Sequence, residues 1–143
     1  MRMRHARAAA TGCCNGAFMV TIVNDEFLIL SLSGVIDTRA LIKLAQDMNK
    51  IEADKLYIKR LVYFKDVTEL SLKCEDVIYY RNIRPEPRIV IKSALCAFSD
   101  FQYGIARMFQ AVMESDKRIM EIFRDIESAA QWLDVDGKIL NNK

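Results

Sequence analysis

Apolar and polar residues recur along this chain with two different periods. Short runs rich in β-branched and aromatic residues, some alternating with a period of two, indicate strands. Between them lie segments whose apolar residues recur every three or four positions, which is the pattern of helices packed on one side. The predicted strands cover residues 20–24, 27–33, 60–65, 88–93 and 118–124.

Four helices are predicted, each preceded by a residue able to cap its first turn. The second of these helices ends near Ile83, because Arg84 precedes a proline and is disfavoured in the helical region. The element order is therefore β-β-α-β-α-β-α-β-α, which predicts one α/β domain with a mostly parallel sheet and flanking helices. The expected caps are Asp37 or Thr38, Thr68 or Ser71, Ser99 or Asp100, and Asp125.

The 143 residues are expected to form one domain that spans residues 19–136. Residues 1–18 are rich in Arg and Ala and have no apolar periodicity, which indicates a disordered extension or an upstream translation start. They are expected to be dispensable for folding. Residues 137–143 are expected to form a flexible tail. Trp132 and Leu133 are expected to be largely buried, with the last helix closing one edge of the core.

The third helix contains the stretch FQYGIARMFQAVMES, residues 101–115, with a glycine in its middle. Glycine inside a helix costs about 1 kcal/mol relative to alanine. Because Gly104 and Ala111 lie seven residues apart at the border of the apolar stripe, we expect close approach of another backbone there. The stripe itself predicts core packing rather than a cofactor pocket, and it consists of Phe101, Ile105, Met108, Phe109 and Val112.

The second helix has apolar residues on two opposite sides. One side, which is predicted to pack on the sheet, carries Leu70, Cys74, Val77 and Ile78. Contiguous apolar groups on the other side suggest a contact surface for a protein partner or a second copy of the chain. Burial of this side under a neighbouring helix or subunit is the open alternative. The predicted contact residues are Leu72, Tyr79, Tyr80 and Ile83.

Recognisable catalytic chemistry is missing from the sequence. The one histidine, His5, lies in the N-terminal extension, and the four cysteines include no C-x-x-C pair. Neither a glycine-rich nucleotide loop nor a P-loop occurs. We therefore predict no catalytic residue, no cofactor and no metal site. Cys74 and Cys96 are expected to be small buried hydrophobes, as in a reduced cytoplasmic protein, and no apolar run is long enough for a membrane span.

The charge distribution gives no indication of a nucleic-acid partner. The net charge is +2, and the three arginines of residues 1–18 account for the excess. The remaining basic residues are spread over several predicted elements, so we interpret them as a solvated surface rather than a single-strand-binding patch. They include Lys55, Lys59, Arg60, Arg81, Arg84, Arg88 and Lys92, interspersed with Tyr57, Tyr79 and Tyr80.

The element order, the helix FQYGIARMF and the ending VMESDKRIMEIFRDIESAAQWL resemble the SpoIIAA-like branch of the STAS superfamily, the fold of anti-sigma-factor antagonists. The resemblance covers residues 19–136. It implies a four- or five-stranded sheet with helices mainly on one side, and a role in binding rather than catalysis. That family carries a phosphorylated serine at the start of its second helix, in a D-S-S-G-like motif. Here the region reads KDVTELSLKCED, so Thr68 and Ser71 are candidate phosphorylation sites or plain caps, without the motif.

These observations favour a cytoplasmic, non-catalytic regulatory module that binds a protein partner or forms a dimer. Two alternatives remain open. A carrier or sensor of a small apolar or lipid ligand would be favoured by a cavity lined by Phe101, Phe109 and Tyr79. An enzyme with an unrecognised carboxylate site would be favoured by clustered acids with raised pKa values in a cleft.

Overall fold

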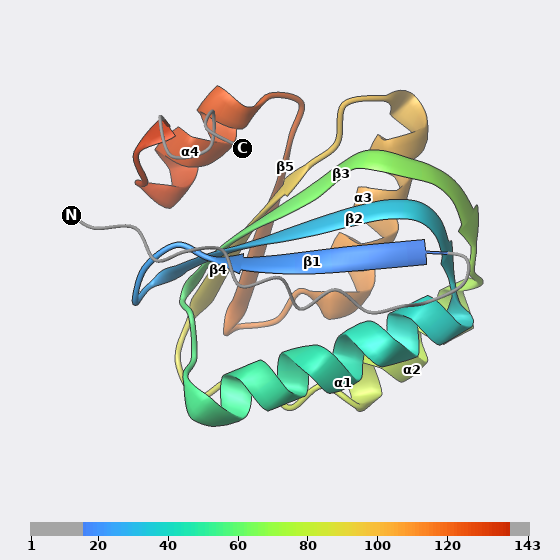
Figure 1. The fold of residues 1–143 in the computed structure, drawn as a ribbon, viewed down its shortest axis with the longest axis horizontal. Coiled ribbons are helices and arrows are strands. Elements are labelled where there is room, and N and C mark those ends of the chain that lie inside the picture. The colour runs from blue at the N-terminus through green and yellow to red at the C-terminus, as the bar shows by residue number, and fades with distance from the viewer. Residues whose placement is uncertain (1–15, 138–143) are drawn as a thin grey trace.

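A computed structural model gives the fold of residues 16–137, which form a five-stranded sheet with four helices (Figure 1). The predicted element order is confirmed. The strands are β1 (Gly16–Ile22), β2 (Phe27–Asp37), β3 (Lys59–Ser71), β4 (Ile91–Cys96) and β5 (Arg118–Phe123). The helices are α1 (Thr38–Asp54), α2 (Cys74–Asn82), α3 (Asp100–Met113) and α4 (Ile126–Leu133).

The strands lie in the sheet in the same order as in the sequence. β1 pairs with β2 as an antiparallel hairpin, while β2, β3, β4 and β5 pair in parallel. The hairpin turn is held by the Asn24 side chain, whose Oδ1 accepts hydrogen bonds from the backbone N–H groups of Glu26 and Phe27. Each parallel connection carries a helix, as parallel pairing requires. The predicted α/β class with a mostly parallel sheet is therefore confirmed.

Three helices cover one face of the sheet and one helix covers the other (Figure 1). Alternate residues of each strand point to opposite faces. In β2, for example, Leu28 and Leu30 face the core under α1, α2 and α3, whereas Phe27 and Ile29 face the smaller core under α4. The expectation of helices mainly on one side is thus confirmed.

The first strand begins earlier than predicted. β1 starts at Gly16, and Phe18 is only 3% exposed within the larger core. The boundary placed before Met19 is therefore wrong by three residues, because the short apolar run ahead of Met19 is paired with β2. Residues 1–15 of the predicted extension and residues 138–143 of the predicted tail lie outside the described residues.

The second helix begins later than predicted, because β3 continues to Ser71 alongside β2. Thr68 and Ser71 therefore lie in a strand and do not cap the helix. Instead, the Asp76 carboxylate accepts a hydrogen bond from the backbone N–H of Lys73, the residue before α2. Cys74 starts the helix on its exposed side, so its predicted burial is wrong, whereas the predicted burial of Cys96 is confirmed.

The third helix has the predicted cap, Ser99, whose Oγ accepts from the backbone N–H of Gln102. Its first turn faces differently from the prediction. Phe101 is 47% exposed, and the buried position belongs to Gln102, whose amide donates to the backbone carbonyl of Lys65. A side chain added at Gly104 would meet nothing within 4 Å, so the expected close backbone approach is wrong.

The last helix is capped by Asp125, as predicted, through a hydrogen bond from the backbone N–H of Ser128. Leu133 is buried in the core under α4, as predicted. Trp132 is only half-buried, and its ring packs against Phe123 and beneath the ammonium of Lys92, 4.3 Å from the ring centroid. The predicted near-complete burial of Trp132 is therefore wrong, whereas α4 closes the smaller core on one face of the sheet.

Candidate functional site

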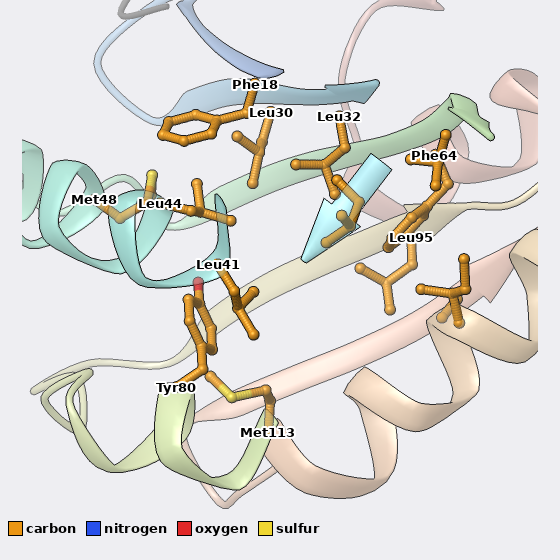
Figure 2. Close-up of a cluster of buried hydrophobic side chains, with 14 of the residues drawn as sticks. Phe18, Leu30, Leu32, Leu41, Leu44, Met48, Phe64, Tyr80, Leu95 and Met113 are labelled. Atoms are coloured by element: carbon orange, nitrogen blue, oxygen red, sulfur yellow. The ribbon is translucent and has the colours of Figure 1, made fainter. Parts of the chain in front are cut away.

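The larger core contains a cavity of about 110 Å³ between the sheet and helices α1, α2 and α3. Figure 2 shows the cluster of side chains to which its lining belongs: Phe18 and Leu30 lie over Leu44 and Met48 of α1, and Tyr80 lies between Leu41 and Met113. Most of the walls are apolar. They include Leu28, Leu30, Leu32, Leu41, Leu44, Met48, Phe64, Leu95, Phe109 and Met113.

One end of the cavity is charged. Glu52, Arg60, Arg84 and Arg118 all line it, together with the small polar side chain of Ser93. We call these four charged residues the arginine cluster. Pro85 lines the same cavity and is exposed, so the charged end is the end that reaches the surface.

Glu52 is held between two buried arginines. Arg84 donates from Nη1 to Oε1 at 2.7 Å and from Nη2 to Oε2 at 3.0 Å, which is a bidentate pair. Arg60 contacts Oε2 through Nη2 and donates from Nε to the backbone carbonyl of Tyr57 at 3.1 Å. Asn49 accepts a further hydrogen bond from Arg84 Nη1 at 2.7 Å. These contacts fix the orientation of both guanidinium groups.

Arg118 completes the cluster from the edge of the sheet. Its Nη1 lies 3.2 Å from Oε1 of Glu86, which is largely exposed, and its Nη2 donates to the backbone carbonyl of Pro85. The segment between α2 and β4 is thereby tied to β5 beside the cavity.

The topology explains why these residues meet. Arg60 and Arg118 lie at or next to the first residue of β3 and β5, and parallel strands begin at the same edge of a sheet. Helices between parallel strands end at this edge. Glu52 therefore comes from the last turn of α1, and Arg84 follows α2, where the carbonyl end of the helix favours a cation.

Burial and charge pairing oppose each other in this cluster. Burial raises the pKa of Glu52, but the hydrogen bond from Arg84 and the charges of Arg60 and Arg84 outweigh it and lower the pKa below its ordinary value. Burial also lowers the pKa of Arg60, against the attraction of Glu52. For Arg84, Tyr80 and Glu52 outweigh burial and raise the pKa. Guanidinium groups stay protonated at neutral pH in each case.

Positive charge exceeds negative charge around the cavity end. The three arginines of the cluster are paired with two carboxylates, those of Glu52 and Glu86, which leaves one positive charge uncompensated. In addition, Arg84 Nε is buried and has no hydrogen-bond partner among the described residues. A buried donor without a partner and an excess of buried charge are both costly. Both features suit an anionic group at this position.

The residues predicted as a contact surface do not share one face. Tyr80 is only 8% exposed, lines the cavity and packs edge-on against Phe109, so its predicted exposure is wrong. Leu72 and Ile83 are half-buried against the larger core. Tyr79 is 52% exposed, and its exposed apolar neighbour is Ile78, which was predicted to be buried.

The cavity meets the conditions for a ligand carrier in part. Phe109 lines it, as that alternative required, but Phe101 and Tyr79 are exposed and do not. The condition for an enzyme is not met here: Glu52 is the one carboxylate in the lining formed by the described residues, and its pKa is lowered rather than raised. Within residues 16–137, no group of three or more His, Cys, Asp or Glu residues could hold a metal ion.

The arginine cluster was not identified from the sequence. The interpretation of Arg60 and Arg84 as part of a solvated surface is wrong, since both are buried. The signal was nevertheless present in the strand pattern. Arg60 shares its face of β3 with Val62 and Phe64, and Glu52 follows Met48 by four residues on the buried stripe of α1. A charged residue at a position whose pattern predicts burial needs a partner of opposite charge or a hydrogen bond.

The candidate phosphorylation sites are exposed and lie apart from the cavity. Thr68 and Ser71 occupy the last part of β3, whereas Arg60 stands near its start. Phosphorylation at either hydroxyl stays a prediction. No helix of the described region is long and apolar enough to cross a membrane.

The sequence matches no model of a known protein family and no curated protein. Among solved structures, an uncharacterized protein of the DUF3478 family from Shewanella loihica PV-4, with a SpoIIAA-like fold, is similar to this chain. The TM-score is 0.55 and the identity 14%, over 86% of this chain and 97% of that chain. The SpoIIAA-like fold predicted from the sequence is therefore confirmed.

Two structures of SpoIIAA itself are more distant. The phosphorylated form of this Bacillus cell fate determinant has 12% identity over 80% of this chain and 98% of its own. The unphosphorylated anti-sigma factor antagonist has 10% identity over 83% and 98%, and each has a TM-score of 0.48. At these identities the likeness concerns the fold, and the ligand has to be argued from the site.

Proposed function

We propose that this protein is a cytoplasmic, non-catalytic binding module that holds a small, mostly apolar molecule between the sheet and helices α1, α2 and α3. The observation that carries this proposal is the cavity of about 110 Å³, which is lined by leucine, methionine and aromatic side chains. An engineered apolar cavity of about 150 Å³ is large enough to bind benzene. Free thiols at Cys74 and Cys96 support a reducing compartment.

The energetic cost of such a cavity supports a bound ligand. Protein interiors are close-packed, with few voids larger than a water molecule. At about 24 cal/mol per Å³, the rate for closed apolar cavities, an unfilled cavity of this volume would cost at most roughly 2–3 kcal/mol. That is a large part of the ~5–15 kcal/mol by which small domains are stable. A ligand that fills the cavity would recover part of this cost.

Ser93→Leu should close the site without unfolding the protein. Ser93 lines the cavity from the middle of β4, next to Ile91 and Leu95, so a leucine there would project into the cavity volume. We expect the affinity for 1-hexanol, followed by the NMR shifts of lining methyl groups, to fall about tenfold or more, each tenfold being about 1.4 kcal/mol. The melting temperature should stay the same or rise.

Ser128→Leu is the matched control, since Ser128 is exposed on α4 at the opposite face of the sheet. This variant should bind 1-hexanol like the unmodified protein. The proposal is wrong if 1-hexanol causes no shifts in lining residues, or if Ser93→Leu folds and binds it unchanged.

We also infer a contact surface on α2 for a second copy of the chain, now centred on Ile78 and Tyr79. These two neighbours are 39% and 52% exposed. Tyrosine is favoured at interfaces, because its ring buries area while its hydroxyl stays hydrogen-bonded. Closed two-fold dimers are also the commonest protein assembly. Regulation through protein contact would then use a surface separate from the cavity.

Changing Ile78 and Tyr79 together to Asp should abolish dimer formation, measured by light scattering, and leave the circular dichroism unchanged. Ile89 and Val90 provide a control pair of similar exposure in the loop before β4. Their replacement by Asp should not alter the oligomeric state. A monomeric unmodified protein, or a dimer that survives the α2 variant, would place any protein contact elsewhere.

A further inference from the structure

We propose that the ligand carries a single carboxylate, which is bound by Arg84 and Arg118 at the charged end of the cavity. This inference rests on the proposed function, because it places the polar head of a ligand whose apolar body occupies the cavity. The ligand would thus be a small amphipathic monocarboxylic acid.

The first argument is the buried donor. Arg84 presents two guanidinium nitrogens to Glu52 and also interacts with the side chain of Tyr80, but its third nitrogen, Nε, is buried and makes no hydrogen bond of good geometry within residues 16–137. The Arg84 side chain is only 5% exposed, and it lines the cavity. A carboxylate oxygen at the cavity end would give this N–H a charge-assisted hydrogen bond.

The second argument is the charge balance. Three guanidinium groups meet two carboxylates at this end, so one negative charge would neutralise the cluster. A phosphate carries up to two charges at neutral pH and would reverse the imbalance. A neutral head group would leave it uncorrected, and a cation would be repelled.

The third argument concerns position and size. Arg118 is at the start of β5, with Ser93 on β4 and exposed Pro85 also in the lining, so the head group would lie between the surface and the apolar walls. A volume of about 110 Å³ admits a body of roughly four to six carbons, by comparison with the cavity of about 150 Å³ that holds the six carbons of benzene. A short-chain carboxylic acid fits both the position of the charged end and the volume of the cavity.

The test compares three probes of equal chain length on the full-length protein: hexanoate, 1-hexanol and hexyl phosphate. Binding is followed at pH 7 by NMR shifts and by titration calorimetry. We expect hexanoate to bind about tenfold more tightly than 1-hexanol, because it adds charge-assisted hydrogen bonds, and more tightly than hexyl phosphate. In Arg118→Gln the preference for hexanoate over 1-hexanol should fall to about threefold or less, with binding of 1-hexanol unchanged.

Arg124→Gln is the control, since Arg124 is paired with exposed Asp100 outside the cavity, and it should keep the full preference. Equal affinity for hexanoate and 1-hexanol would overturn the proposal that the ligand carries a carboxylate and would leave the proposed function intact. Tighter binding of hexyl phosphate, or an unchanged preference in Arg118→Gln, would also overturn it. If none of the three probes shifts the lining residues, the proposed function fails as well.

Discussion

Replacing Phe18 by alanine should lower the free energy of unfolding by about 3–5 kcal/mol, the usual cost of removing a buried aromatic side chain. Phe18 lies on β1, one of the two edge strands of the sheet, and is only 3% exposed. Its ring lies over Leu44 and Met48 of α1, so it joins the first strand to the first helix (Figure 2). Urea denaturation followed by circular dichroism would measure the change.

Met19→Ala is the matched control, because the neighbouring side chain points to the other face and is 39% exposed. This substitution should change the stability by less than about 0.5 kcal/mol. A Phe18→Ala cost as small as that of Met19→Ala would mean that the first residues of β1 are dispensable for folding, as the sequence pattern alone had indicated.

The error at Phe18 shows where pattern-based prediction stops. A strand is recognised by several alternating residues, but residues 16–18 follow a stretch rich in Arg and Ala that has no period. What makes them a strand is pairing with β2, in which Phe18 is opposite Leu32. Pairing with the other side of β2 likewise extends β3 through Thr68 to Ser71, where helix capping was predicted. Long-range pairing overrode local preference at both places.

Elements with strong internal patterns were predicted correctly. The apolar stripe of α1 and the caps at Asp37, Ser99 and Asp125 depend on residues a few positions apart, so the sequence contains the whole signal. The arginine cluster is different, because its members come from α1, β3, β5 and the segment after α2. These residues are close together because parallel strands begin at one edge of the sheet. The spacing of residues within a single element contains no information about this.

The short α2 is a further case in which the local pattern misled. Its apolar residues occur on both sides, so a helical wheel could not decide which side is buried. The structure buries Val77 and Tyr80 and exposes Ile78 and Tyr79. Tyr80 is fixed by its contact with Phe109, a residue of α3 that lies 29 positions later in the sequence. Packing between helices therefore determines which residues of α2 line the cavity, and the spacing of its apolar residues alone does not predict them.

Glu52→Gln should destabilise the protein by about 3–5 kcal/mol at pH 7, the range expected when one member of a buried ion pair is removed. Glutamine keeps the size of the side chain but supplies no charge, so the guanidinium groups of Arg60 and Arg84 would remain buried without a counter-ion. Glu86→Gln is the control of identical chemistry. Glu86 is paired with Arg118 but is largely exposed, so its replacement should cost no more than about 1 kcal/mol.

The difference in stability between the unmodified protein and Glu52→Gln should depend on pH. Arg60 and Arg84 hold the pKa of Glu52 below its ordinary value near 4.5, so the carboxylate contributes its full stabilisation above that pH. As the pH falls through the lower folded-state pKa, Glu52 becomes protonated and the stabilisation is lost, while the arginines of the cluster keep their charge. Denaturation curves of both proteins from pH 7 to pH 3 should therefore converge on acidification. Curves that stay parallel over this range would show that the charge of Glu52 does not stabilise the fold, and the arginine cluster would then need another counter-charge.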